Sequence, residues 1–84
     1  MAGNPIFTEF PSVAVAVTPS DSVNLTVDMT IYVGTGGNVT VIPAGTATAV
    51  LYKNVPAGGV IPCKVRRINA TGTDATDFVG HYNP

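Results

Sequence analysis

The chain has 84 residues with a net charge of −1, and 45% of them are hydrophobic while only 11% are charged. This length allows one domain, since about 150 residues per domain is the usual prior, and the balance of charge gives no basic field for nucleic-acid binding. The single cysteine, Cys63, excludes an internal disulfide and a zinc site built from cysteines. Val, Ile and Thr together supply 29 residues, which predicts an all-β fold because β-branched side chains fit a pleated sheet.

The first segment, residues 1–12, contains two prolines and no regular periodicity, so we expect an extended N-terminal arm ahead of a single domain over residues 13–84. Phe7 and Phe10 lie in this arm, although disordered tails usually lack aromatic residues. Twelve extended residues reach roughly 40 Å. The arm could therefore contact a neighbouring subunit, or it could fold back on its own domain.

Short apolar segments separated by Gly- and Pro-rich turns follow the arm. The clearest alternation covers residues 22–29, whose apolar members are predicted to face the core: Val23, Leu25, Val27 and Met29. About seven short antiparallel strands of this kind predict a small sandwich or barrel. The predicted strands are 13–17, 22–29, 30–33, 39–42, 46–53, 60–69 and 77–82.

The glycine-rich segment 34–38 is the first candidate for a ligand site. A phosphate loop would need a following helix, and a Walker motif would also need its lysine. Neither follows here, so we expect the segment to be a hairpin turn between two strands.

Few residues suit catalysis or metal binding. Cys63 and His81 could form a nucleophilic pair only if their strands were adjacent, and no orienting group or oxyanion motif accompanies them. Asp77 shares the strand of His81 but lies about 13 Å from it along an extended chain. The acidic residues show no metal-loop spacing. We therefore predict no enzymatic activity, no metal and no cofactor. The longest apolar run, residues 13–17, is also far shorter than the ~20 residues that cross a membrane.

Lys64, Arg66 and Arg67 are three of the four basic residues in the chain. In a regular strand, Lys64 and Arg66 would share one face, while Arg67 would point the other way with Cys63 and Val65. This footprint is too narrow for nucleic acid. Two interpretations remain: a contact with an acidic protein partner, and an edge strand protected by its charges.

Several turn and strand sequences occur in a characteristic order and spacing. They are Thr18-Pro-Ser-Asp21, Ile31-Tyr-Val-Gly34, Asn54-Val-Pro-Ala-Gly58, Pro62-x-Lys64-Val-Arg66-Arg67, and Ala70-Thr-Gly72 followed by Ala75-Thr-Asp77. Over residues 18–82 this series resembles the head-spike base proteins of gene transfer agents and tailed phages. Two features depart from the resemblance: residues 1–17, which include the arm, and Cys63, where the family pattern would have an aliphatic residue.

The resemblance implies a structural protein of the virion surface, made in the host cytoplasm and without enzymatic activity. Such a protein would form a homo-oligomer, with a pentamer favoured, that sits on the capsid protein and supports a spike or fibre protein. Phe7, Phe10, Lys64, Arg66 and Arg67 are the candidate interface residues. Alternatives are a capsid decoration protein, a tail component, or a carbohydrate- or receptor-binding β-module that uses Tyr32, Tyr52 and Tyr82. Neither nucleic acid nor a membrane is expected as a partner.

Overall fold

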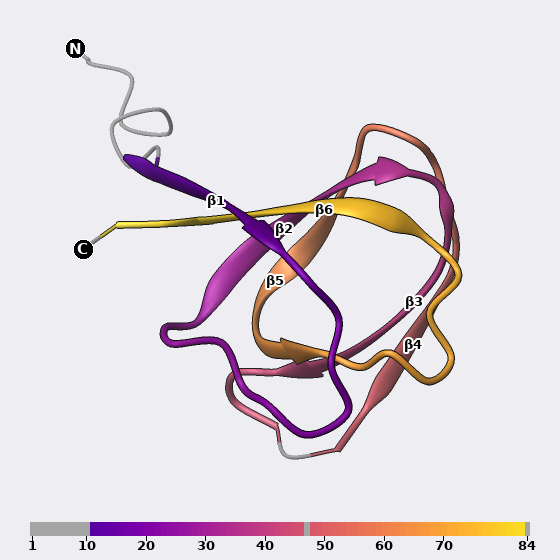
Figure 1. The fold of residues 1–84 in the computed structure, drawn as a ribbon, viewed down its shortest axis with the longest axis horizontal. Helices are drawn as coiled ribbons and strands as arrows, with labels where there is room; N and C mark the ends of the chain where they lie inside the picture. The colour runs from indigo at the N-terminus through magenta and orange to yellow at the C-terminus, as the bar shows by residue number, and fades with distance from the viewer. Residues whose placement is uncertain (1–10, 47, 84) are drawn as a thin grey trace, which may run out of the picture.

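A computed structural model describes residues 11–46 and 48–83, and these residues form six antiparallel strands and no helix (Figure 1). The all-β fold class is confirmed, with six strands where about seven were expected. The strands are β1 (Val13–Val17), β2 (Met29–Thr35), β3 (Gly37–Pro43), β4 (Val50–Val55), β5 (Gly59–Ile68) and β6 (Thr76–Tyr82).

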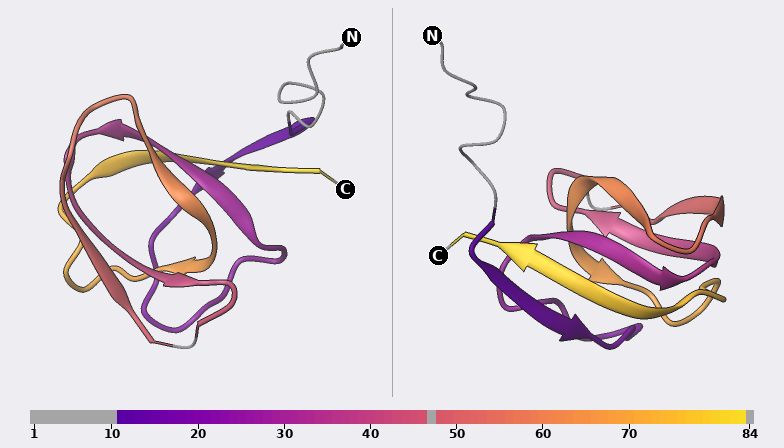
Figure 2. Two further views of the ribbon diagram at one scale, coloured as in Figure 1. Left: turned by 180° about the vertical axis from the view of Figure 1, so that it is seen from behind. Right: turned by 90° about the horizontal axis from the view of Figure 1, so that it is seen from above.

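All six strands belong to one sheet, in the order β1-β6-β2-β5-β3-β4. Only β3 and β4 are neighbours both in sequence and in the sheet, so most of the pairing joins segments that are far apart along the chain. The sheet is strongly curled, and Figures 1 and 2 show its strands wrapping around a common interior. In the described structure its two edges are β1 and β4.

One face of the curled sheet forms the hydrophobic core. In β2, Met29, Ile31 and Val33 are buried, while the alternate residues Thr30 and Tyr32 are not. This period of two is typical of a sheet with one covered face. The other core residues come from β1, β3, β5, β6 and the segment before β6: Val17, Val39, Val41, Ile61, Val65, Ile68, Ala75 and Phe78.

Residues 22–28, which have the clearest alternation in the sequence, do not form a strand. They belong to a loop whose Ser20 and Leu25 amides donate to two carbonyls of β5, each at 2.8 Å. Five residues of loop thus span a distance that two residues of β5 cover, so the intervening chain bows outward. Val23, which lies in this bowed segment, is 67% exposed, and Val27, which follows it, is 39% exposed. The prediction that both valines face the core is wrong.

The glycine-rich segment 34–37 is a corner, and the expected hairpin is absent because β2 and β3 lie on opposite sides of β5. The chain is tightly packed at this corner. A Cβ on Gly36 would lie 2.7 Å from the carbonyl oxygen of Val55, and one on Gly37 would lie 2.9 Å from the amide nitrogen of Ala75. Glycine is needed here for close approach between backbone segments.

Candidate protein-interaction surface

The outer face of β6, β2 and β5 is a broad surface on which polar and apolar side chains lie in rows. Each row follows the cross-strand register, in which residues directly opposite one another have neighbouring side chains. The first row is polar and the second is apolar and aromatic. The rows are His81–Thr30–Lys64 and Val79–Tyr32–Val60. Tyr32 is 39% exposed and Val60 is 54% exposed, so the second row presents apolar area to solvent.

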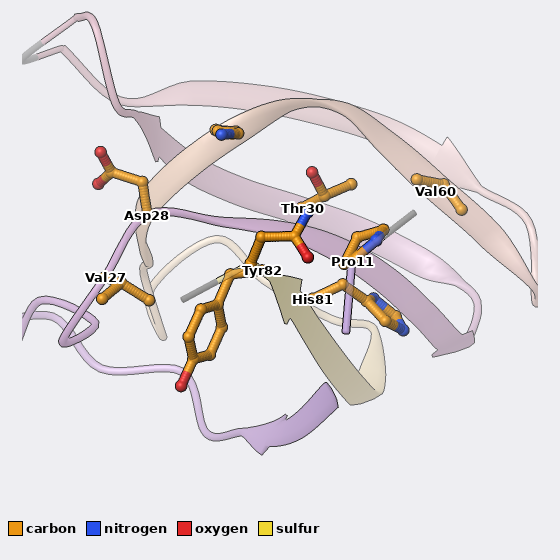
Figure 3. A pocket seen from close by; sticks show the side chains of 9 residues that line it. Pro11, Val27, Asp28, Thr30, Val60, His81 and Tyr82 are labelled. Carbon is orange, nitrogen blue, oxygen red and sulfur yellow. The ribbon is translucent and has the colours of Figure 1, made fainter. Parts of the chain in front are cut away.

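A groove of about 610 Å³ lies over the first row. Thr30, Lys64 and His81 form its floor, and the loop before β2 contributes Val27 and Asp28 to one side. Figure 3 shows these two loop residues at one side of the groove and Val60 at the other. Both ends of the described chain also line the groove. Its lysine, carboxylate, imidazole and hydroxyl groups make it suitable for a hydrogen-bonding contact with a polar surface.

The structure separates the three basic side chains at 64–67. The Lys64 side chain is exposed in the groove and has no hydrogen-bond or ion-pair partner among the described residues. Arg66 donates through Nη2 to the carbonyl of Ala44 at 2.8 Å, and Arg67 donates through Nη1 to the carbonyl of Asp21 at 2.5 Å. Both arginines thus attach neighbouring turns and loops to β5, whereas the Lys64 side chain makes no such contact within the described residues.

A bulge in β5 explains this arrangement. The pairing of β5 with β3 skips Arg66, so that Val65 and Ile68 both face the core although they are three residues apart. Neither arginine between them enters the core. The expectation that Arg67 shares a face with Val65 is therefore wrong, because it assumed a regular strand.

Asp21 is a structural residue that the sequence did not single out. Its carboxylate accepts hydrogen bonds from the amide of Thr71 at 2.9 Å and from the hydroxyl of Thr71 at 2.7 Å. The bond from the Thr71 amide is the largest of several causes that lower the pKa of the Asp21 carboxyl below its usual value. Asp21 thus joins the loop before β2 to the loop between β5 and β6. The signal in the sequence was its position in a Pro-Ser-Asp turn.

Cys63 and His81 do not form a catalytic pair. Their strands, β5 and β6, are separated by β2, and His81 lies on the outer face of the sheet. The Sγ of Cys63 instead lies 3.6 Å from the hydroxyl oxygen of Tyr52, and this hydrogen bond raises the pKa of the Tyr52 hydroxyl. Within residues 11–46 and 48–83, no group of three potential metal ligands comes together. Nor does any helix in that part of the chain suit a membrane span.

The remaining candidate residues lie on different strands or outside the residues that the structure describes. Tyr32 is exposed on the outer face, Tyr52 packs against the core, and Tyr82 lines the groove and also contacts the core. The three tyrosines therefore do not form a single stacking platform for a sugar. Phe7 and Phe10, the candidate interface residues of the arm, lie outside the described residues.

Comparisons with known proteins identify the family. No protein-family model matches the chain, and no curated protein matches it. A solved structure described as "Capsid of native GTA particle computed with C5 symmetry" contains a similar chain, with a TM-score of 0.73 and 32% sequence identity. The match covers 84% of this chain and 82% of that one. At this identity and coverage, the chain belongs to the same family as that chain of a gene transfer agent capsid and is a virion structural protein.

Proposed function

We propose that this protein forms an oligomeric base on the capsid surface, at the five-fold vertices, and supports a head spike or fibre. The observation that carries the proposal is the similarity, at 32% identity, to a chain of a gene transfer agent capsid described with C5 symmetry. The order of the turn and strand sequences in residues 18–82 supports the more specific role of a spike base. A pentamer matches the symmetry of the vertex.

The surface of the chain suits a structural role. Apolar residues are exposed on the outer face at Tyr32 and Val60 and on β4 at Leu51, while only 11% of the chain is charged. Apolar area of this kind is commonly covered in an assembly. Lys64, which has no described partner, is proposed to meet an acidic group of the capsid or spike protein through the groove.

The other candidate interface residues are proposed to take part in two different contacts. Arg66 and Arg67 each use one guanidinium nitrogen for a contact within the chain, and Nε of Arg67 is buried. The other guanidinium donors of the two arginines are proposed to extend the contact around Lys64. Phe7 and Phe10 are proposed to dock on a neighbouring copy or on the capsid, because two aromatic side chains supply a large apolar contact area.

The test is electron microscopy of particles from cells that lack the gene and from cells in which it is restored. We expect the five-fold vertices to lose both the base and the spike in the first case and to regain both in the second. Complementation with a Gly45→Ala variant is the matched control, since a Cβ there would meet no atom within 4 Å. Density at other capsid positions would indicate a decoration protein, and density on the tail would indicate a tail component. Either result would contradict the proposal.

A further inference from the structure

Strand β1 is an edge strand without the usual protection. It pairs with β6 in unbroken register from Val13 opposite Tyr82 to Val17 opposite Phe78, and within the described residues it has no second strand partner. Soluble proteins normally protect such an edge with a lysine, a proline or a bulge, because its free backbone groups can pair with another chain. The sequence of β1, Val-Ala-Val-Ala-Val, contains none of these.

The hydrophobic core is also open at both edges of the sheet. Val15 lies opposite the buried Gly80, so it faces the core, yet it is 36% exposed. At the other edge, Val50 lies opposite Val41, which is fully buried, yet Val50 is 39% exposed. Both inward-facing valines therefore lack a covering layer. The single subunit leaves part of its own core uncovered where the sheet ends.

The two edges are compatible with each other in length and direction. All strand pairs in the sheet are antiparallel. Strand direction therefore alternates through the six strands from β1 to β4, which means that these two edge strands run in opposite directions. Placing β1 of one copy beside β4 of the next continues the alternation. The strands have five and six residues, so nearly their whole lengths can pair.

We propose that β1 of one copy pairs with β4 of the next, so that sheet and core continue from subunit to subunit. The occupant of each edge is thus a second copy of this chain. Such a contact is head-to-tail, and it closes into a ring when the rotation from one copy to the next divides a full turn, as the five-fold vertex of the proposed function requires. The inference rests on the homo-oligomer in the proposed function and specifies its interface. Symmetric pairing of β1 with β1, or of β4 with β4, would pair one edge strand of each copy and leave its other edge strand unpaired.

Disulfide cross-linking tests the pairing in a Cys63→Ser background. Ala16 in β1 and Leu51 in β4 both lie on the outer face, where directly paired side chains come close enough for a disulfide. Several registers between β1 of one copy and β4 of the next are possible. Each of Ala14→Cys and Ala16→Cys is therefore combined with each of Leu51→Cys and Lys53→Cys, so that the four double variants test different registers. We expect at least one double variant to give a ladder of covalent multimers on a non-reducing gel. Each single variant should stay monomeric on that gel.

A charge in β1 provides a second measurement that does not depend on register. We expect Ala16→Lys to reduce the mass seen by light scattering to that of the monomer, because a lysine protects an edge strand from pairing. The matched control is Ala57→Lys in the exposed turn before β5, which should leave the oligomer intact. Circular dichroism would verify that both variants keep the β fold.

The outcomes separate this inference from the proposed function. Dimers formed by a single-cysteine variant would show symmetric pairing and overturn the head-to-tail contact. An oligomer that never cross-links and tolerates Ala16→Lys would place the interface elsewhere, while the vertex location could still be correct. A wild-type chain that is monomeric at tens of micromolar and on the virion would overturn the edge pairing. Only imaging of the particles decides the vertex role.

Discussion

Asp21 connects two loops of the described chain through its carboxylate. The stability of the fold therefore depends on whether this group is protonated. Its pKa is lowered from 3.8 in the folded protein, first by the Thr71 amide bond. A carboxyl group with a depressed folded pKa stabilises the fold above its unfolded pKa, about 3.9, and this contribution is lost as pH falls through the folded value. We therefore expect Asp21→Asn to be less stable than wild type at pH 7, and this difference in stability to shrink as the pH falls below the unfolded pKa.

Urea denaturation at pH 7 and at pH 2.5 would measure this convergence. The control is Asp28→Asn, because Asp28 is exposed and makes no side-chain hydrogen bond with another described residue. Its stability should follow that of wild type at both values. An Asp21→Asn variant with the same stability deficit at both pH values would show that the ionised carboxylate contributes nothing beyond the hydrogen bonds an amide can replace.

Gly80 occupies a core-facing position that has no room for a side chain. A Cβ at this position would lie 2.9 Å from Cγ2 of Val17 and would overlap the Sδ of Met29. We expect Gly80→Ala to lower the free energy of unfolding by about 1–3 kcal/mol, which is the usual cost of overpacking. Gly45→Ala is the matched control and should be neutral, or stabilising by up to about 1 kcal/mol. Equal midpoints in urea for the two variants would contradict the packing argument.

At the scale of the strands, alternation in the sequence predicts which segments are extended where a strand is present to pair with them. β1 begins and ends where the sequence indicated, at residues 13 and 17, and β2 buries every second residue from Met29 to Val33. Residues 22–28 alternate equally well but are a loop. Alternation shows that a segment could cover a core. Whether it does so depends on a partner strand. The pairing of β2 with β5 begins only at Met29, so residues 22–28 lie outside it.

Strand order and bulges were the parts that the sequence could not supply. The polar row His81–Thr30–Lys64 exists only because β2 lies between β6 and β5, and no local pattern encodes that order. Likewise, a bulge changes the side to which every later residue of a strand points. The sequence shows that three basic residues lie within four positions. It could not show that Arg66 and Arg67 bind backbone carbonyls within the chain while Lys64 lies in the groove.

At the scale of the whole molecule, the low charge and the open core both indicate a chain that leaves apolar surface uncovered at the edges of its sheet. With 11% charged residues, the chain has few ionic groups with which to solvate its edges. Val15 and Val50 are inward-facing apolar residues that are partly exposed, one at each edge of the sheet. A subunit of this kind gains stability from its neighbours, because binding that favours the folded state adds to the free energy of unfolding. The fold is therefore suited to a ring more than to a solitary domain.

If the edge strands form the ring, the arm is left for attachment to the capsid. We expect deletion of residues 2–10 to keep the ring, with its mass reduced only by the missing residues, but to abolish incorporation into particles. This deletion retains Pro11 in the groove and Ser12, whose amide donates to Oδ1 of Asn83 at 2.9 Å. Light scattering of the purified chain and immunoblotting of purified particles would measure the two effects.

The double variant Phe7→Ala/Phe10→Ala separates the aromatic side chains from the length of the arm. It should reproduce the loss of incorporation, because removing both rings removes most of the apolar contact area that the arm can offer. Thr8→Ala, in the same segment, is the matched control and should leave incorporation unchanged. If the deletion left both the ring and incorporation unaltered, the arm would have no part in assembly. A fall to the monomer mass would instead assign the arm to the contact between neighbouring copies, where Phe7 and Phe10 would add to the pairing of β1 with β4.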